Sequence, residues 1–317
     1  MTVQHTPADV VCIASWNADL TSHVARPIAR GETLMATDFS ISPGGKGSNA
    51  AVACARQGAR VALIARIGDD DFGRMGMDLW HAEGIATDHV ERAPGERSGV
   101  AQILVYDDGD NSIAVHPGAG SSLSARQVLA ARDLIEGSGV VMASCEVPVE
   151  ATLQAFQLAR AAGVITLLNP APARPLPAAL LALVDVLTPN ESELYQLAGP
   201  EHADSVDNAA RHLLTLGAGA VLVTLGAAGC RLYQPGRTPL ELAGRDMPVA
   251  DTIGAGDTFT GALAATLARG EALATAMQWA NAAAALSVTR HGAIAGIPAL
   301  VELASYMTES TESTRRR

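Results

Sequence analysis

Short apolar runs alternate with longer helix-like runs over most of the chain, and this alternation limits the possible folds more than any other feature. The predicted strands are 10–14, 61–67, 140–143, 164–168, 184–187 and 220–224. The predicted helices include 48–57, 72–83, 149–162 and 273–288. Strands that alternate with helices form βαβ units. We therefore expect a doubly wound α/β fold, with a mostly parallel sheet and helices on both faces.

A hairpin interrupts this alternation. Two strand-like runs, 98–105 and 112–115, flank the turn 106–111, whose aspartates, asparagine and glycine are typical of hairpin turns. Residues 33–41 are a further candidate strand. The hairpin could extend an edge of the main sheet, or form a small lid that closes over a site and excludes water.

Composition narrows the possible partners. With 48% hydrophobic residues among 317, the chain can bury one large core, with or without a small appendage. Its 22 basic and 33 acidic residues give a net charge of −11, which argues against nucleic acid or an anionic membrane as the main partner. The four cysteines are far apart, which favours reduced thiols. No run resembles a targeting signal or a membrane span, so we expect a cytoplasmic protein.

The glycine-rich turn 251–258 leads directly into a helical pattern that ends at Gly270. Gly254 and Gly256 allow the backbone to turn sharply and to approach a ligand. The unpaired N–H groups at the start of a helix can then form an anion hole, suited to a phosphoryl group in transfer. Asp257 at this position is either a base that takes a proton from an attacking hydroxyl or a simple N-cap.

Polar residues also follow the predicted strands. Asn17 and Asp19 come just after the first strand, where both side chains can face one side, although a solvated loop is the alternative. The cluster 44–49 is not a Walker A loop, because Gly47 stands where that motif needs Ser or Thr. Together with Lys46 and Asn49, its amides could bind the hydroxyls of a polyol, or the cluster could be a capped turn.

A third group of residues suits a metal–nucleotide complex. Asn190 and Glu193 share one face at a helix start, where they could hold Mg²⁺ through water or form a helix cap. The small-residue loop 224–229 leaves room for a nucleotide. The sequence lacks the G-x-G-x-x-G dinucleotide motif, the H-E-x-x-H zinc motif and the G-x-S-x-G nucleophile elbow, which weakens those three enzyme classes.

Taken together, the motifs at 17–19, 44–49, 168–174, 188–193 and 251–258 resemble those of the PfkB family of carbohydrate kinases, in the family's order and spacing. The resemblance implies a single α/β domain over 1–317, with a β-sheet lid formed by insertions at about 17–43 and 97–117. It implies phosphorylation of a sugar's primary hydroxyl by ATP and Mg²⁺, with D-ribose as the leading substrate. Another pentose, a ketohexose or a nucleoside is the alternative within the family. A non-catalytic sugar- or nucleotide-binding regulator is the alternative outside the enzyme class.

The resemblance also assigns roles to residues. Asp257 is the expected base, with the amides of Gly254, Ala255 and Gly256 as the anion hole. The expected sugar ligands are Asn17, Asp19, Gly45, Lys46, Asn49, Ile103 and Glu146. The expected nucleotide and Mg²⁺ residues are Asn190, Glu193, Thr224, Gly226, Gly229 and Asn281. The family uses a monovalent cation, K⁺, for which the matching positions are Asp251, Ile253, Ser287, Arg290, Gly292 and Gly296.

Three positions depart from the family pattern. Gly296 stands where a serine is typical. Trp16 replaces a small aliphatic residue and Gln102 an apolar one; either could reshape the sugar pocket, or Trp16 could pack internally and Gln102 face outwards. The family often pairs its lid edges between subunits, so the resemblance also implies a homodimer.

Overall fold

The structure is a computed structural model that describes residues 8–315. Within this range, the larger sheet has nine strands in the order β13-β12-β11-β10-β9-β8-β1-β4-β5. Its strands are β1 Val10–Ala14, β4 Val61–Gly68, β5 Ala86–Ala93, β8 Val140–Ser144, β9 Ile165–Asn169, β10 Val186–Leu187, β11 Val221–Thr224, β12 Gly229–Tyr233 and β13 Leu240–Ala243. The run from β5 to β11 is parallel, and β12 and β13 add an antiparallel edge.

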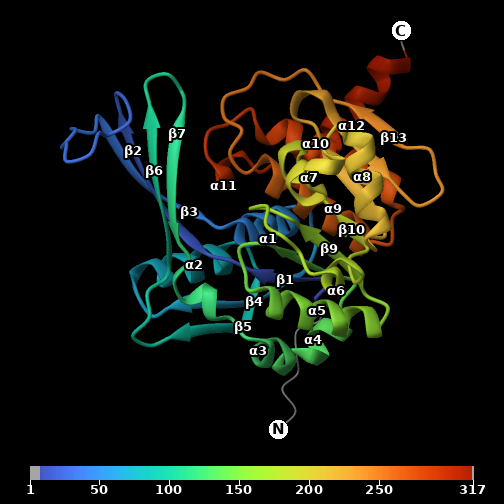
Figure 1. Ribbon diagram of the computed structural model, residues 1–317, viewed down its shortest axis with the longest axis horizontal. Coiled ribbons are helices and arrows are strands. Elements are labelled where there is room, and N and C mark those ends of the chain that lie inside the picture. Colours follow the sequence, from blue (N-terminus) through green and yellow to red (C-terminus); the bar gives the residue numbers. More distant parts are fainter. Residues whose placement is uncertain (1–7, 316–317) are drawn as a thin grey trace.

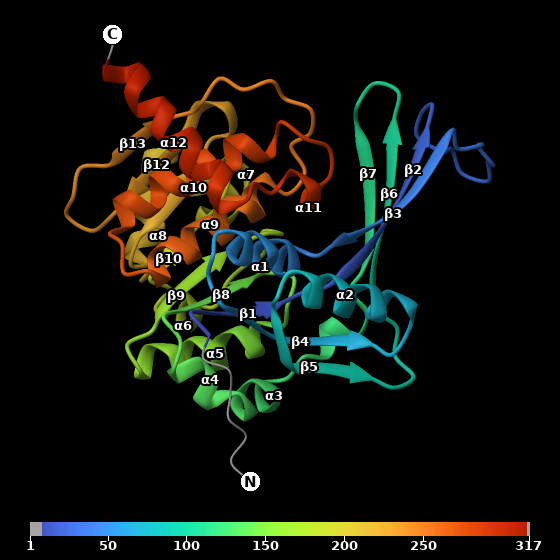
Figure 2. The ribbon, with the colours of Figure 1, turned by 180° about the vertical axis from the view of Figure 1, so that it is seen from behind.

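Helices cover both faces of this sheet (Figures 1 and 2). Alternation along β1 explains this arrangement, because Val11 and Ile13 join the core on one face while Val10 and Cys12 join the core on the other. The first face is covered by α3 Ala125–Ala130, α4 Arg132–Glu136, α5 Val149–Ala161, α6 Ala178–Leu181, α7 Glu191–Ala198 and α8 Val206–Thr215. The second is covered by α1 Lys46–Arg56, α2 Asp71–Ala82, α9 Ala255–Ala268 and α10 Leu273–Ser287. The short α11 Ala293–Gly296 and the C-terminal α12 Leu300–Arg315 follow, and α12 packs against α10.

The predicted α/β fold with a smaller sheet is therefore confirmed, and the differences lie at its margins. The candidate strand 33–41 is wrong at its start, since β3 begins at Asp38, where pairing with β2 begins. The edge strands β5 and β13, the strand β12, and helices α3, α4, α8 and α12 were not predicted. The periodic signal is weak in β5, a partly exposed edge strand, and in α3 and α4, which are only five or six residues long. Helix α8 is amphipathic, and its periodic pattern was missed.

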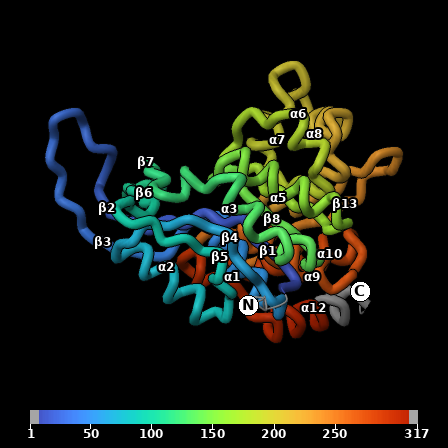
Figure 3. The backbone as a smooth tube through the Cα atoms, turned by 90° about the horizontal axis from the view of Figure 1, so that it is seen from below, coloured from blue at the N-terminus to red at the C-terminus, as the bar shows by residue number. Residues whose placement is uncertain are grey.

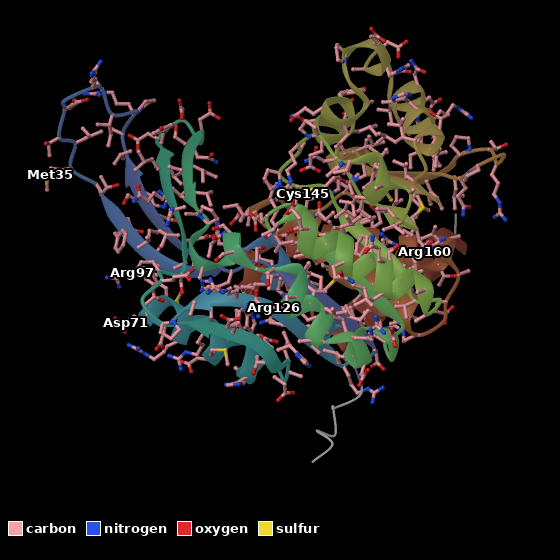
Figure 4. All side chains as sticks on the ribbon, turned by 60° about the horizontal axis from the view of Figure 1, so that its bottom comes forward. Met35, Asp71, Arg97, Arg126, Cys145 and Arg160 are labelled. Atoms are coloured by element: carbon pink, nitrogen blue, oxygen red, sulfur yellow. The ribbon has the colours of Figure 1, made fainter. Side chains whose placement is uncertain are left out.

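The smaller sheet has four strands within the described residues, in the order β3-β2-β6-β7. They are β2 Asn17–Val24, β3 Asp38–Gly44, β6 Gly99–Tyr106 and β7 Asn111–His116. The sheet projects from the body of the molecule (Figure 1), and the loop 25–37 extends far from it (Figure 3). Met35 lies on this loop, far from Cys145 at the end of β8 (Figure 4). The hairpin thus forms a separate sheet; its action as a lid stays a prediction.

The cysteines are buried and free of disulfides, as expected. Along residues 8–315, the helices are either too short or too polar to cross a membrane.

Candidate active site

The turn before α9 places Asp257 in the interior. Gly254 has φ of 76°, a left-handed conformation that favours glycine, and it is the N-cap of α9. No side chain caps this helix, so the N-cap interpretation of Asp257 is wrong. Asp257 is 5% exposed, and its Oδ2 accepts a hydrogen bond of 2.9 Å from Asn49 Nδ2 on α1. The carboxylate is therefore held in place by a side chain from a distant part of the sequence.

The backbone donors beside Asp257 are only partly free. The N–H of Ala255 donates to the Thr252 carbonyl at 3.3 Å. In contrast, the N–H groups of Gly256 and Asp257 donate to no backbone oxygen of the described chain. Ala255 is thus engaged by the turn in this conformation, whereas Gly254 and Gly256 of the predicted anion hole donate to no backbone oxygen of the described residues.

Charges of both signs converge on this site. Burial raises the pKa of Asp257 to about 6, with Glu146 and Glu193 adding to the rise while Lys46 and Asn49 oppose it. Burial likewise raises the pKa of Asp19 to about 7. Burial alone would lower the pKa of Lys46, but the surrounding carboxylates, Asp257 foremost, raise it above its ordinary value. Lys46, the only lysine of the sequence, therefore stays charged among four acids.

Two of the predicted sugar residues lie on one face of β2. Asn17 is 6% exposed and begins β2, and Asp19 follows two residues later on the same face. The Asp19 carboxylate lies directly over Gly44, where a Cβ would come within 2.2–2.3 Å of its atoms. Ile103 pairs with Thr21 across the sheet and shares this face, whereas Gln102 is exposed on the opposite face.

Ser15 was not predicted as a site residue, yet it connects three parts of the site. Its hydroxyl donates to Glu146 Oε2 at 2.6 Å and accepts from the Gly47 N–H at 3.0 Å. Glu146 Oε2 also accepts from the Lys46 N–H at 2.8 Å. The hydroxyl thus fixes Glu146 against the start of α1. Its position directly after a buried strand is the signal that could have found it.

Asp257 and Lys46 also line a cavity of about 180 Å³. Of the predicted nucleotide residues, Asn190, Glu193 and Thr224 line it, while Gly226, Gly229 and Asn281 do not. The Asn281 amide instead donates to the Ala243 carbonyl at 3.1 Å. The cavity also contains side chains that were not predicted, namely Asn169, Thr188, Thr252 and Phe259.

The sequence left open whether Asn190 and Glu193 form a helix cap, and in the structure they do. Asn190 Oδ1 accepts from the Glu193 N–H at 2.8 Å, and Glu193 Oε2 accepts from the Asn190 N–H at 2.9 Å. This capping box begins α7 and leaves Glu193 Oε1 available towards the cavity. Capping and a role towards a metal are compatible here.

The segment predicted to hold a cation is closely packed. Asp251 accepts from the N–H of Ile253 at 2.9 Å and of Gly292 at 2.8 Å, so it links the turn before α9 to the turn before α11. A Cβ at Gly296 would lie 2.6 Å from the Ser287 carbonyl oxygen and 3.7 Å from that of Arg290. A serine would therefore not fit here without movement, and glycine lets the Ser287 carbonyl come close.

Trp16 does not line the sugar side. It is 3% exposed, donates to the Phe72 carbonyl at 3.1 Å and meets the Trp80 ring edge-on at 5.4 Å. Its ring lies against Gly76 of α2, where a Cβ would come within 2.9 Å. The packing interpretation of Trp16 is therefore confirmed, and Trp16 departs from the family pattern without entering the pocket.

Comparison with known proteins identifies the family to which the chain belongs. The family model described as "pfkB family carbohydrate kinase" matches residues 7–300. The chain belongs to the PfkB family of carbohydrate kinases. It is 38% identical to a ribokinase of Haemophilus influenzae over 93% of this chain and 97% of that protein. It is 33% identical to a deoxyribokinase of Salmonella typhi over 95% of this chain and 99% of that protein.

One solved structure has the same fold as this PfkB protein over nearly the full length of both chains. The structure of Arabidopsis thaliana ribokinase complexed with ribose and ATP superposes with a TM-score of 0.87 at 29% identity. The match covers 95% of this chain and 98% of that chain. Membership of the family therefore extends over nearly the whole chain, smaller sheet included.

Proposed function

We propose that the chain transfers the γ-phosphoryl group of ATP to the primary hydroxyl of D-ribose, which yields ribose 5-phosphate and ADP. One observation carries the proposal: Asp257, buried beside the free amide of Gly256, is held by Asn49 and faces Lys46. The relatives support the choice of substrates, since the Arabidopsis ribokinase structure is that of a complex with ribose and ATP.

In this proposal Asp257 accepts the proton of the sugar hydroxyl while the hydroxyl oxygen attacks the γ-phosphorus. The new oxygen–phosphorus bond forms, the bond from the γ-phosphorus to the β–γ bridging oxygen breaks, and ADP leaves with that electron pair. A pKa of about 6 suits this role, because the carboxylate is ionised at neutral pH and still basic enough to accept a proton.

The remaining residues position the reactants. The sugar hydroxyls are held by Asn17, Asp19, Lys46 and Glu146. The free amides at the start of α9 donate hydrogen bonds to the negatively charged oxygens of the phosphoryl group. Mg²⁺, when bound, offsets the charge of the β- and γ-phosphates. Glu193, with one oxygen outside its capping box, is the residue best placed to orient the water shell of the metal.

The carbonyl oxygens of Ser287 and Arg290 both lie near Gly296, and Asp251 accepts from the N–H of the nearby Gly292. We propose that K⁺ binds there and stabilises the turn that ends at Asp257. Gly296 supplies no side-chain oxygen, so in this proposal backbone carbonyls provide more of the coordination.

We also propose that the smaller sheet closes over the sugar and pairs with a second copy of the chain. Its two edge strands expose large apolar side chains, namely Phe39, Ile41, Ile113 and Val115 at 48–56%. Light scattering on the purified protein tests the dimer; a monomer at micromolar concentration would refute it.

An ADP-release assay with a panel of acceptors tests the main proposal. Ribose should give the highest kcat/KM among ribose, deoxyribose, fructose and adenosine. Deoxyribose belongs in the panel because the Salmonella typhi relative is named a deoxyribokinase. Preference for another acceptor would identify a different kinase of the family. Sugar binding without ADP release would favour the non-catalytic regulator.

A further inference from the structure

We propose that Asn169 is a further catalytic residue, whose side-chain amide donates a hydrogen bond to a non-bridging oxygen of the phosphoryl group in transfer. The inference rests on the proposed function, since it adds a donor to that reaction. It arises from three observations on one side chain: its place in the sheet, its burial without a partner and the charges that surround it.

Asn169 lies at the centre of the functional edge of the sheet. It is the last residue of β9 and pairs in register with Ser144, the last residue of β8. Glu146, on the sugar side, comes two residues after Ser144, and Thr188, in the cavity, comes directly after β10. Because carboxyl ends of parallel strands meet at the same edge, Asn169 lies between the sugar residues and the metal–nucleotide residues.

The Asn169 side chain is largely buried, lies on the cavity wall and has no protein partner for its amide among the described residues. The side chain is 6% exposed and lines the cavity that also contains Lys46 and Asp257. Throughout residues 8–315, no protein group accepts from or donates to this amide. The amide is therefore free to bond to water or to a ligand that enters the cavity. Asn190 differs in this respect, because its Oδ1 is already committed to the capping box of α7.

The surrounding charges indicate that the amide acts as a donor. The cavity already contains two acidic side chains, Glu193 and Asp257, but Lys46 is its single cationic side chain among the described residues. An anionic phosphoryl group in this cavity needs N–H donors more than it needs further oxygens. The Asn169 N–H groups supply neutral donors from the edge of the sheet, in the same cavity as Gly254 and Gly256 at the start of α9.

Substitutions at Asn169 distinguish a role as a hydrogen-bond donor from a role as a metal ligand. Asn169→Ala removes the amide, and we expect kcat to fall about 10²-fold, as for loss of one donor to a developing oxyanion. Asn169→Asp keeps an oxygen but places a third carboxylate beside the phosphoryl group, so we expect a larger loss. Asn169→Ser keeps one donor and should retain more activity than Asn169→Ala. KM for ribose and ATP should change little in all three variants.

Thermal melting distinguishes this role from a structural one. Because the amide bonds to no described protein group, the melting temperature of Asn169→Ala should stay close to that of the wild type. Binding of ADP with aluminium fluoride and ribose should weaken along with kcat, because that complex mimics the transferring phosphoryl group. The half-buried Asn208 on α8, whose amide donates to Asp204 at 2.7 Å, provides a control: Asn208→Ala should match the wild type in kcat.

Four results would overturn the inference. These are an Asn169→Ala variant with wild-type kcat, a loss confined to the KM for ribose, and an Asn169→Asp variant that stays active with an altered Mg²⁺ midpoint. The fourth is a lowered melting temperature that accounts for the lost activity. If the wild type phosphorylates no acceptor, the proposed function fails together with the inference. An active wild type with an equally active Asn169→Ala overturns only the role of Asn169.

Discussion

Asp257→Asn should make the folded protein more stable at neutral pH while it removes the proposed base. Burial raises the pKa of Asp257 from 3.8 to about 6 in the folded state. The folded protein therefore binds more protons than the unfolded chain between about pH 4 and pH 6. Because of this difference, the contribution of Asp257 to stability falls as the pH rises through that window.

The size of the effect follows from the shift. Two pKa units correspond to roughly 3 kcal/mol, since one unit is about 1.4 kcal/mol. Asparagine carries no charge and keeps an oxygen that can accept from Asn49. Asp257→Asn should therefore gain up to about 3 kcal/mol above pH 6 and almost nothing below pH 4.

Thermal or urea unfolding of both proteins at pH 4.5 and pH 7.5, followed by circular dichroism, measures this gain. Asp108→Asn in the exposed β6–β7 turn removes the same single negative charge and should show no such pH-dependent gain. If Asp257→Asn is no more stable than the wild type at pH 7.5, or gains equally at both pH values, burial of the ionised Asp257 carboxylate does not destabilise the folded protein.

Three further predictions concern the rest of the site. Ser15→Ala removes the 2.6 Å hydrogen bond to Glu146, and we expect ribose affinity, measured by calorimetry, to fall about 10-fold while ATP affinity is retained. Gly44→Ala places a Cβ within 2.2 Å of the Asp19 carboxylate, so KM for ribose should rise by about 10-fold or more; an unchanged KM would contradict the placement of Asp19. Activity should rise when K⁺ replaces tetramethylammonium, and equal rates at saturating MgATP would count against the proposed cation site.

The sequence predicted the parts of the fold that depend on periodic burial. The strands β1, β4 and β8 are mostly apolar, buried and paired on both sides, and their predicted bounds agree with the structure to within one residue. In contrast, β3 and β7 are almost fully exposed, so their pattern contains little burial signal. The pairing of β3 with β2 depends on contacts that only the folded chain supplies, whereas the β6–β7 hairpin was predicted from its turn residues.

The site was predictable where a motif is contiguous and not where it is assembled. Asp257 and its glycines lie in one stretch, and the turn has the predicted form. The hydrogen bond that holds Asp257 joins residues 208 positions apart, and no local sequence pattern predicts it. Asn169 also follows a strand as Asn17 does, but only its lack of a partner in three dimensions makes it a candidate.

The pairing of a buried carboxylate with an attacking hydroxyl is the central claim, and single-turnover phosphoryl transfer to ribose tests it most directly. Asp257→Asn should bind ribose and MgATP with near wild-type affinity and transfer the phosphoryl group about 10²–10⁴-fold more slowly. Transfer at the wild-type rate by this variant would contradict the account.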